Sequence, residues 1–127
     1  MVKDMSEIRS HRDLVAWQKA MELASDVMQF TKSLPVEERF GLVSQLRRAC
    51  VSVPSNIAEG YGRGTTADYI RFLRTARGSL YEIDTQALLC VRFAYVSQST
   101  YDAILERVNE CGRILAALIR SLEDRNA

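Results

Sequence analysis

Few residues of this chain carry groups that could do enzyme chemistry. His11 is the single histidine of the 127 residues, and it lies in a polar segment without helical periodicity. A catalytic site needs a nucleophile with a base, paired carboxylates, or metal ligands at a workable spacing. The cysteines Cys50, Cys90 and Cys111 are widely spaced and form no C-x-x-C pair, whereas zinc takes about four ligands. We therefore predict no enzymatic activity, no metal and no cofactor, and three reduced, buried thiols.

Polar residues recur along the segment QLRRACVSVPSNIAEGYGR, residues 45–63. On a helix of ~3.6 residues per turn, one stripe holds Gln45, Arg48, Ser52, Asn56 and Glu59. A hydrogen-bonded seam between two helices explains this stripe better than a reactive site, because an unpaired buried polar group costs ~1–3 kcal/mol. Folding the chain back at the next turn brings Glu82 near Arg48 and Ser52 near Ala76. We predict that Arg48 and Glu82 form a partly buried ion pair in this seam.

The densest group of basic residues surrounds a glycine-rich turn, and its members are Arg63, Arg71, Arg74 and Arg77. They form either a patch that contacts phosphates or an ordinary solvated helix face, and we prefer the second interpretation. Gly60, Gly62 and Gly64 follow a helical pattern rather than a strand, so they indicate a turn and not a nucleotide cradle. The formal net charge is +1, whereas proteins built mainly to hold a phosphate backbone show a large basic excess.

Apolar periodicity predicts four helices with short connections, over about residues 14–33, 36–60, 66–95 and 101–123. The second of these continues through Pro54, because its apolar face and its polar stripe keep their phase on both sides of the proline. We predict an all-α, antiparallel up-down four-helix bundle that forms one domain over residues 1–127.

Residues 1–12 are polar and are expected to form a flexible leader. Asp13 is the expected N-cap of the first helix, and Thr65 or Thr66 that of the third. The N-terminal residues contain no apolar core of a signal peptide, and no apolar run approaches the ~20 residues of a membrane span. We expect a cytoplasmic protein that does not contact membranes.

Two helices carry more apolar residues than one core needs. The first helix has one apolar series at Leu14, Trp17, Met21, Ala24 and Met28. It also has a further series: Ala16, Ala20, Leu23, Val27, Phe30 and Leu34. The third helix adds Leu88, Leu89 and Phe93 outside its core face. Exposed together, such side chains exceed the few hundred Å² that monomers usually tolerate. We therefore predict an oligomer whose interface contains Leu23, Val27, Phe30, Leu89 and Phe93.

The run VSVPSNIAEGYGR, residues 51–63, and three shorter motifs together resemble a known family. The shorter motifs are Asp13, Leu14 and Trp17, the run ERFGL at 38–42, and the run ARGSLYE at 76–82. Over nearly the whole chain, these residues are similar to the four-helix-bundle family encoded in intervening sequences of bacterial 23S ribosomal RNA genes. The resemblance implies an up-down bundle that assembles as a ring-like pentamer. It also implies a relation to the accessory proteins of diversity-generating retroelements, which bind a reverse transcriptase and nucleic acid.

Two classes of function therefore stay open. The first is an oligomeric accessory or scaffold protein that contacts RNA or DNA in a ribonucleoprotein, with a reverse transcriptase or another protein as partner. The second is a purely protein-binding oligomeric scaffold. The near-neutral charge of this chain separates it from the strongly basic retroelement accessory proteins, and so does not favour the first class.

Overall fold

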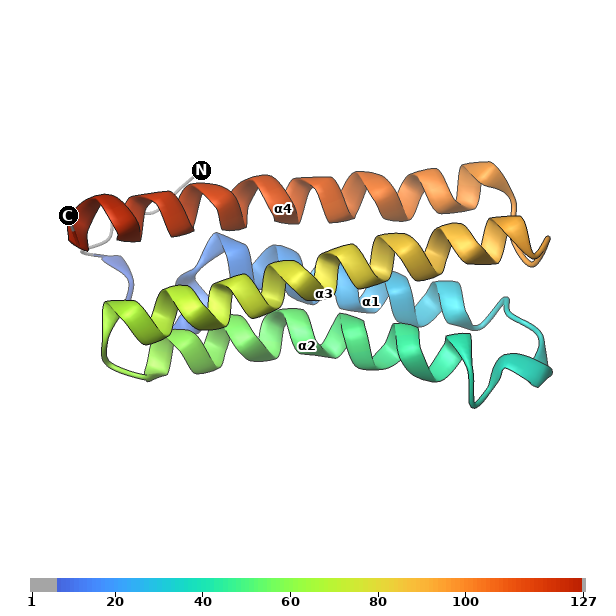
Figure 1. Cartoon of the computed structure of the whole chain (residues 1–127), viewed down its shortest axis with the longest axis horizontal. Coiled ribbons are helices and arrows are strands. Elements are labelled where there is room, and N and C mark those ends of the chain that lie inside the picture. Colours follow the sequence, from blue (N-terminus) through green and yellow to red (C-terminus); the bar gives the residue numbers. More distant parts are fainter. Residues whose placement is uncertain (1–6, 127) are drawn as a thin grey trace.

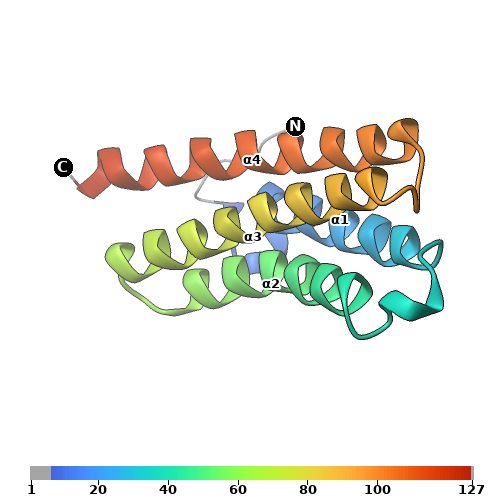
Figure 2. The same cartoon turned by 45° about the vertical axis from the view of Figure 1, so that its right-hand side comes forward.

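Four long helices form the computed structural model of this chain, which describes residues 7–126 (Figure 1). The helices are α1 (Val15–Thr31), α2 (Leu42–Gly62), α3 (Thr66–Arg92) and α4 (Gln98–Asn126). Short 3-10 helices precede the first two: η2 (His11–Asp13) and η3 (Val36–Glu38). Successive long helices run in opposite directions in both views, and residues 7–126 contain no strand (Figures 1 and 2). The predicted all-α, up-down four-helix bundle is confirmed.

An apolar core runs the length of the bundle. Each long helix contributes fully buried side chains, among them Leu23, Leu46, Leu73 and Leu115. The predicted apolar face of α2 is buried throughout, and α2 passes through Pro54 without interruption. All three cysteines are free and buried, as predicted.

The apolar faces of α1 differ from those predicted. Leu23, Val27 and Phe30 are buried in the core of the single chain, at 0%, 1% and 6% exposed, so they offer little surface for contact between subunits. The exposed apolar side chains of α1 belong to the other series, at Met21 and Met28. The prediction that Leu23, Val27 and Phe30 lie at an oligomer interface is therefore corrected. Both series recur at spacings of three and four residues, and only packing against the other helices distinguishes them.

The ends of α2 and α3 follow from local hydrogen bonding. The predicted second helix began at Val36, but η3 and an irregular Gly41 (φ −108°, ψ −111°) delay the start of α2. Thr65 caps α3 as predicted, because its Oγ1 accepts a hydrogen bond from the N–H of Asp68 at 3.2 Å. At the other end of α3, Ala94 has a φ of 61°, which ends the helix earlier than predicted.

Part of the predicted leader contacts the bundle. The ring of His11 meets that of Trp17 edge-on, with 5.2 Å between the centroids. Asp13 does not cap α1, since Leu14 is the N-cap and the Asp13 carboxylate accepts from the N–H of Arg9 at 2.9 Å. Residues 1–6 of the predicted leader lie outside the described residues. Within residues 7–126, none of the helices combines the length and apolar character that crossing a bilayer requires.

Candidate interaction surfaces

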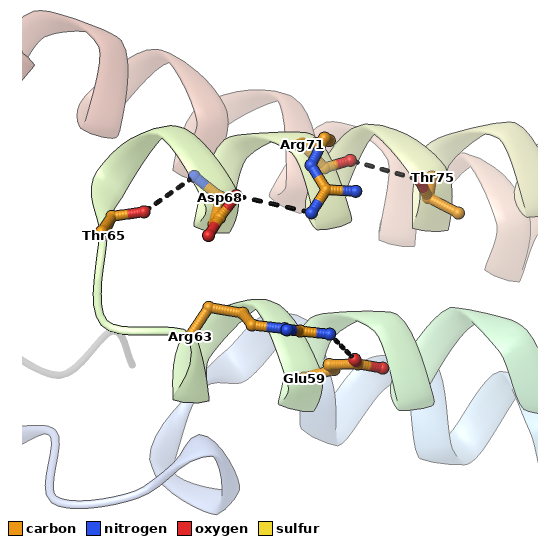
Figure 3. A network of polar contacts seen from close by, with 6 residues as sticks. All are labelled: Glu59, Arg63, Thr65, Asp68, Arg71 and Thr75. Carbon is orange, nitrogen blue, oxygen red and sulfur yellow. Dashed lines mark hydrogen bonds and ion pairs between the residues drawn. The ribbon is translucent and has the colours of Figure 1, made fainter.

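Four arginines were considered as possible phosphate contacts, and two of them flank the turn between α2 and α3 (Figure 3). Arg63 forms an ion pair with Glu59, and Arg71 forms one with Asp68 at 3.4 Å. Both guanidinium groups also lie over the ring of Phe72, at 4.9 and 4.6 Å from its centroid. Exposed pairs of this kind stabilise a fold by only ~0–1 kcal/mol. These ion pairs matter for the charge of the surface, because the carboxylate beside each arginine offsets its positive charge.

The other two arginines considered as phosphate contacts, Arg74 and Arg77, differ in whether they have a carboxylate partner. Arg74 donates to the carboxylate of Glu123 on α4 at 2.8 Å. Arg77 forms no ion pair with any residue of the described chain, and it lines a groove of ≈ 380 Å³ between α3 and α4 together with Tyr81 and Arg113. The four arginines therefore do not form one basic patch, since only Arg77 lacks a carboxylate partner among the described residues.

The polar stripe of α2 forms hydrogen bonds with α3. Ser52 Oγ accepts from the hydroxyl of Ser79 and from Nδ2 of Asn56, both at 2.9 Å. Two turns earlier in α2, Gln45 Oε1 accepts from Nε2 of Gln86 at 3.4 Å. Ser79 and Gln86 are buried, so these bonds satisfy the Ser79 hydroxyl and Nε2 of Gln86 inside the interface between the helices, whereas Oε1 of Gln86 has no hydrogen-bond partner in the described chain. Gln45 and Ser52 of the predicted seam thus bond to α3, whereas Asn56 bonds to Ser52 within α2 and Glu59 pairs with Arg63.

The ion pair predicted between Arg48 and Glu82 is not formed. Both side chains line a cavity of ≈ 270 Å³ between α2 and α3, yet neither has an ion-pair partner within residues 7–126. The register of the two helices also differs from the predicted one, because Ser52 lies opposite Ser79 rather than Ala76. Both charged groups are on exposed residues, so neither requires a partner within the protein.

The connection between α1 and α2, residues 35–41, presents apolar side chains to solvent. Phe40 is 86% exposed, the highest fraction among the large apolar side chains of the described residues, and Val36 is 73% exposed. The guanidinium of Arg39 lies 5.0 Å from the centroid of the Phe40 ring. Arg39 and Glu37 form no ion pair in the part of the chain that the structure describes. We call residues 35–41 the Phe40 loop.

Glu38 holds the Phe40 loop in place through both oxygens of its carboxylate. Oε1 accepts from the N–H of Leu42 at 3.0 Å, which caps the start of α2, and Oε2 accepts from the hydroxyl of Tyr95 at 2.8 Å. These hydrogen bonds lower the pKa of Glu38, and the bond to the carboxylate raises the pKa of Tyr95. Gly41 leaves room for the contact, because a Cβ there would lie 2.6 Å from Oε1 of Glu38. The loop is therefore a fixed projection anchored on α2 and on the connection after α3.

Two of the predicted interface residues remain at the surface near this loop. Phe93 is 53% exposed, and its ring meets that of Tyr95 edge-on with 5.9 Å between the centroids. Leu89 is half-buried, one turn before Phe93. Because Tyr95 also anchors Glu38, Phe93 and the Phe40 loop lie at the same end of the bundle. Sequence reasoning missed the loop because it placed residues 36–40 inside a helix.

A groove of ≈ 820 Å³ lies between α1 and α4, and we call it the α1–α4 groove. Its apolar wall consists of the exposed Ala103 and of the edges of Phe30 and Ile104, which are 6% and 5% exposed. Arg107 of α4 crosses to α1, where its Nε lies 2.9 Å from Oδ2 of Asp26. Glu106 and Arg113 also line the groove, and neither forms an ion pair among the residues described. The groove thus combines an apolar wall with one uncompensated charge of each sign.

Comparisons with known proteins agree with this fold. Residues 12–117 match the family model of the 23S rRNA-intervening sequence proteins. A similar solved structure is that of a protein with unknown function from the S23 ribosomal protein family of Bacteroides thetaiotaomicron, with a TM-score of 0.77 and 26% sequence identity. That similarity covers 83% of this chain and 98% of the other. A comparison with curated proteins finds no match. Because the family model matches most of its length, the chain belongs to the 23S rRNA-intervening sequence protein family.

Proposed function

We propose that this chain is a non-enzymatic helical module that acts by self-association and by contact with other macromolecules. The observation that carries this proposal is the Phe40 loop, which holds an aromatic ring 86% exposed on an anchored backbone. Aromatic side chains are enriched at the centres of protein interfaces, and an anchored loop loses little conformational entropy on binding. Val36 and Phe93 add apolar surface at the same end of the bundle.

The first partner in this proposal is a second copy of the chain. The family resemblance implies a pentamer, and the exposed apolar residues supply surface for a contact between copies. The state of the cysteines supports a non-enzymatic role, because burial raises the pKa of Cys90 and Cys111 to about 11. Both thiols are protonated at neutral pH and are poor nucleophiles.

Light scattering coupled to size-exclusion chromatography tests self-association. At micromolar concentration we expect a mass that is a multiple of the 14.4 kDa chain, with five copies if the pentamer implied by the resemblance holds. A mass of one chain across the accessible concentrations would contradict the proposal.

A second candidate function is binding of single-stranded nucleic acid at the groove between α3 and α4. Arg77 and Arg113 line this groove without carboxylate partners in the described chain, and the exposed Tyr81 lies beside them. The carboxylate of the groove, Asp84, is hydrogen-bonded to the hydroxyl of Tyr101 at 2.5 Å. Basic grooves with an exposed aromatic ring bind single strands by contacting phosphates and stacking on bases. Such a site would suit the ribonucleoprotein role that a relation to retroelement accessory proteins implies, with a reverse transcriptase as a further partner.

Filter binding as a function of salt tests this second candidate. If Arg77 contacts a phosphate, Arg77→Gln lowers the slope of log affinity against log salt by ~0.7. Arg71→Gln is the matched control, since Arg71 is already paired with Asp68 and is expected to change the slope less. Absence of binding to RNA or DNA at about 50 mM salt and micromolar protein would remove this candidate and leave the protein-binding scaffold.

A further inference from the structure

We infer that the Phe40 loop of one chain docks into the α1–α4 groove of a second copy. The inference rests on the proposed self-association and names the two surfaces that meet. The contact is heterologous, because each chain offers both surfaces and uses different residues for each. Heterologous contacts generate closed rings when the rotation between neighbours closes, and open filaments when it does not.

The groove is large enough to take the Phe40 side chain. The groove volume of ≈ 820 Å³ falls within the ~300–1,000 Å³ of sites that bury a drug-sized ligand, which is ample for a phenyl ring and its flanking side chains. Docking places the ring of Phe40 against Ala103, the exposed apolar side chain that lines the groove. Removing an exposed aromatic ring from water supplies the main driving force, at ~25 cal/mol per Å² of apolar surface buried.

The charges of the two surfaces also match. The Phe40 loop carries one cation and one anion without ion-pair partners in the described chain, at Arg39 and Glu37. The α1–α4 groove also carries one anion and one cation without ion-pair partners among the described residues, at Glu106 and Arg113. Docking pairs Arg39 with Glu106 and Glu37 with Arg113. Complementary charges at the rim of an interface fix its register and disfavour other partners.

The loop does not fill the groove of its own chain. Phe40 is 86% exposed, and the bond from Tyr95 to Glu38 fixes the loop at the end of α2 and α3. Figure 2 shows this connection beside α2, with α4 on the opposite side of the bundle. The α1–α4 groove is therefore filled by the Phe40 loop of a second chain.

Complementation between two variants tests the inference. Phe40→Glu removes the loop contact, and Ala103→Arg fills the groove; both positions are exposed, so both variants are expected to fold. Each variant alone is expected to have the mass of one chain by light scattering. An equimolar mixture is expected to give a two-chain species, because one intact loop and one intact groove remain. Val51→Glu, at an exposed apolar position of α2 outside both surfaces, is the matched control and should keep the wild-type mass.

The results separate this inference from the proposed function. A wild-type protein that associates while Phe40→Glu keeps the same mass would overturn the inference and leave the proposed function standing. Two single-chain variants that form no two-chain species at their highest soluble concentration would also overturn it. As a further check, Arg39→Glu should weaken association and Glu106→Arg should restore it when both changes are present in one chain. Failure of this charge reversal to restore the mass would refute the proposed pairing.

Discussion

Replacing Gly60 with alanine should destabilise the bundle, whereas the same change at Gly78 should stabilise it. Gly60 lies in the last turn of α2, where a Cβ would be 2.7 Å from Cβ of Phe72 and 3.2 Å from the carbonyl oxygen of Tyr69. Neither atom is the tip of a flexible side chain, so α2 and α3 must move apart to admit a methyl group. At Gly78, on the exposed surface of α3, a Cβ meets nothing within 4 Å.

The magnitudes follow from two opposing effects. Alanine is favoured over glycine inside a helix by ~1 kcal/mol, and by less near the end of a helix. Overpacking a close contact costs ~1–3 kcal/mol. For Gly60→Ala we expect a net loss of roughly 1–2 kcal/mol in the free energy of unfolding, because overpacking exceeds the gain in helix propensity. For Gly78→Ala the helix gain is unopposed, and we expect an increase of ~0.5–1 kcal/mol.

Urea unfolding followed by circular dichroism measures both effects. All variants must be compared at one protein concentration, because self-association makes the apparent stability depend on concentration. We expect the midpoint of Gly60→Ala below that of the wild type and the midpoint of Gly78→Ala above it. A Gly60→Ala protein as stable as Gly78→Ala would show that α2 and α3 are not in close contact at this point.

Three further predictions concern the core, the loop and the thiols. Leu23→Ala should lower the free energy of unfolding by ~2–5 kcal/mol, and Met21→Ala by much less; equal losses would contradict the assigned faces of α1. The lowered pKa of Glu38 means that its contribution to stability is present above pH 4.5, the ordinary value, and is lost as pH falls through the folded-state pKa. Glu38→Gln should therefore flatten the acid side of the pH–stability profile, and unchanged profiles would count against the anchoring bonds. Because the pKa values of Cys90 and Cys111 are raised to about 11 and both thiols are buried, a thiol reagent at pH 8 should modify them only after denaturant is added. Fast modification of the native protein would disprove their burial.

Periodicity in the sequence predicted the fold because each helix has an apolar face that repeats over many turns. The phase across Pro54 was sufficient to predict one continuous α2. The same reasoning failed for α1, where two apolar series share the same spacing and only the positions of the other helices select Leu23 over Met21. It failed again at Gly41, because the capping group there is a side chain held by Tyr95, which lies 57 residues from Glu38.

The candidate surfaces were less predictable than the fold because they depend on contacts between distant residues. The sequence shows that Arg74 is basic, but not that it pairs with Glu123, 49 residues away. The ion pair expected between Arg48 and Glu82 is not formed although both side chains line one cavity, so knowing which helix faces lie together was not enough to predict the pairing. The run ERFGL places Phe40 directly before a glycine, but the helix predicted over residues 36–60 included this run. Only the structure shows that Phe40 is exposed.

Site-directed photo-crosslinking tests the account most directly, since it identifies what covers the Phe40 ring in solution. Phe40 is replaced by p-benzoylphenylalanine, the protein is irradiated at micromolar concentration, and the product is digested and mapped by mass spectrometry. The account predicts a covalent product of two chains in which residue 40 is joined to α4 near Ala103 and Ile104 of the second chain. The absence of any product between chains, or attachment to a surface of the second chain outside the α1–α4 groove, would contradict it.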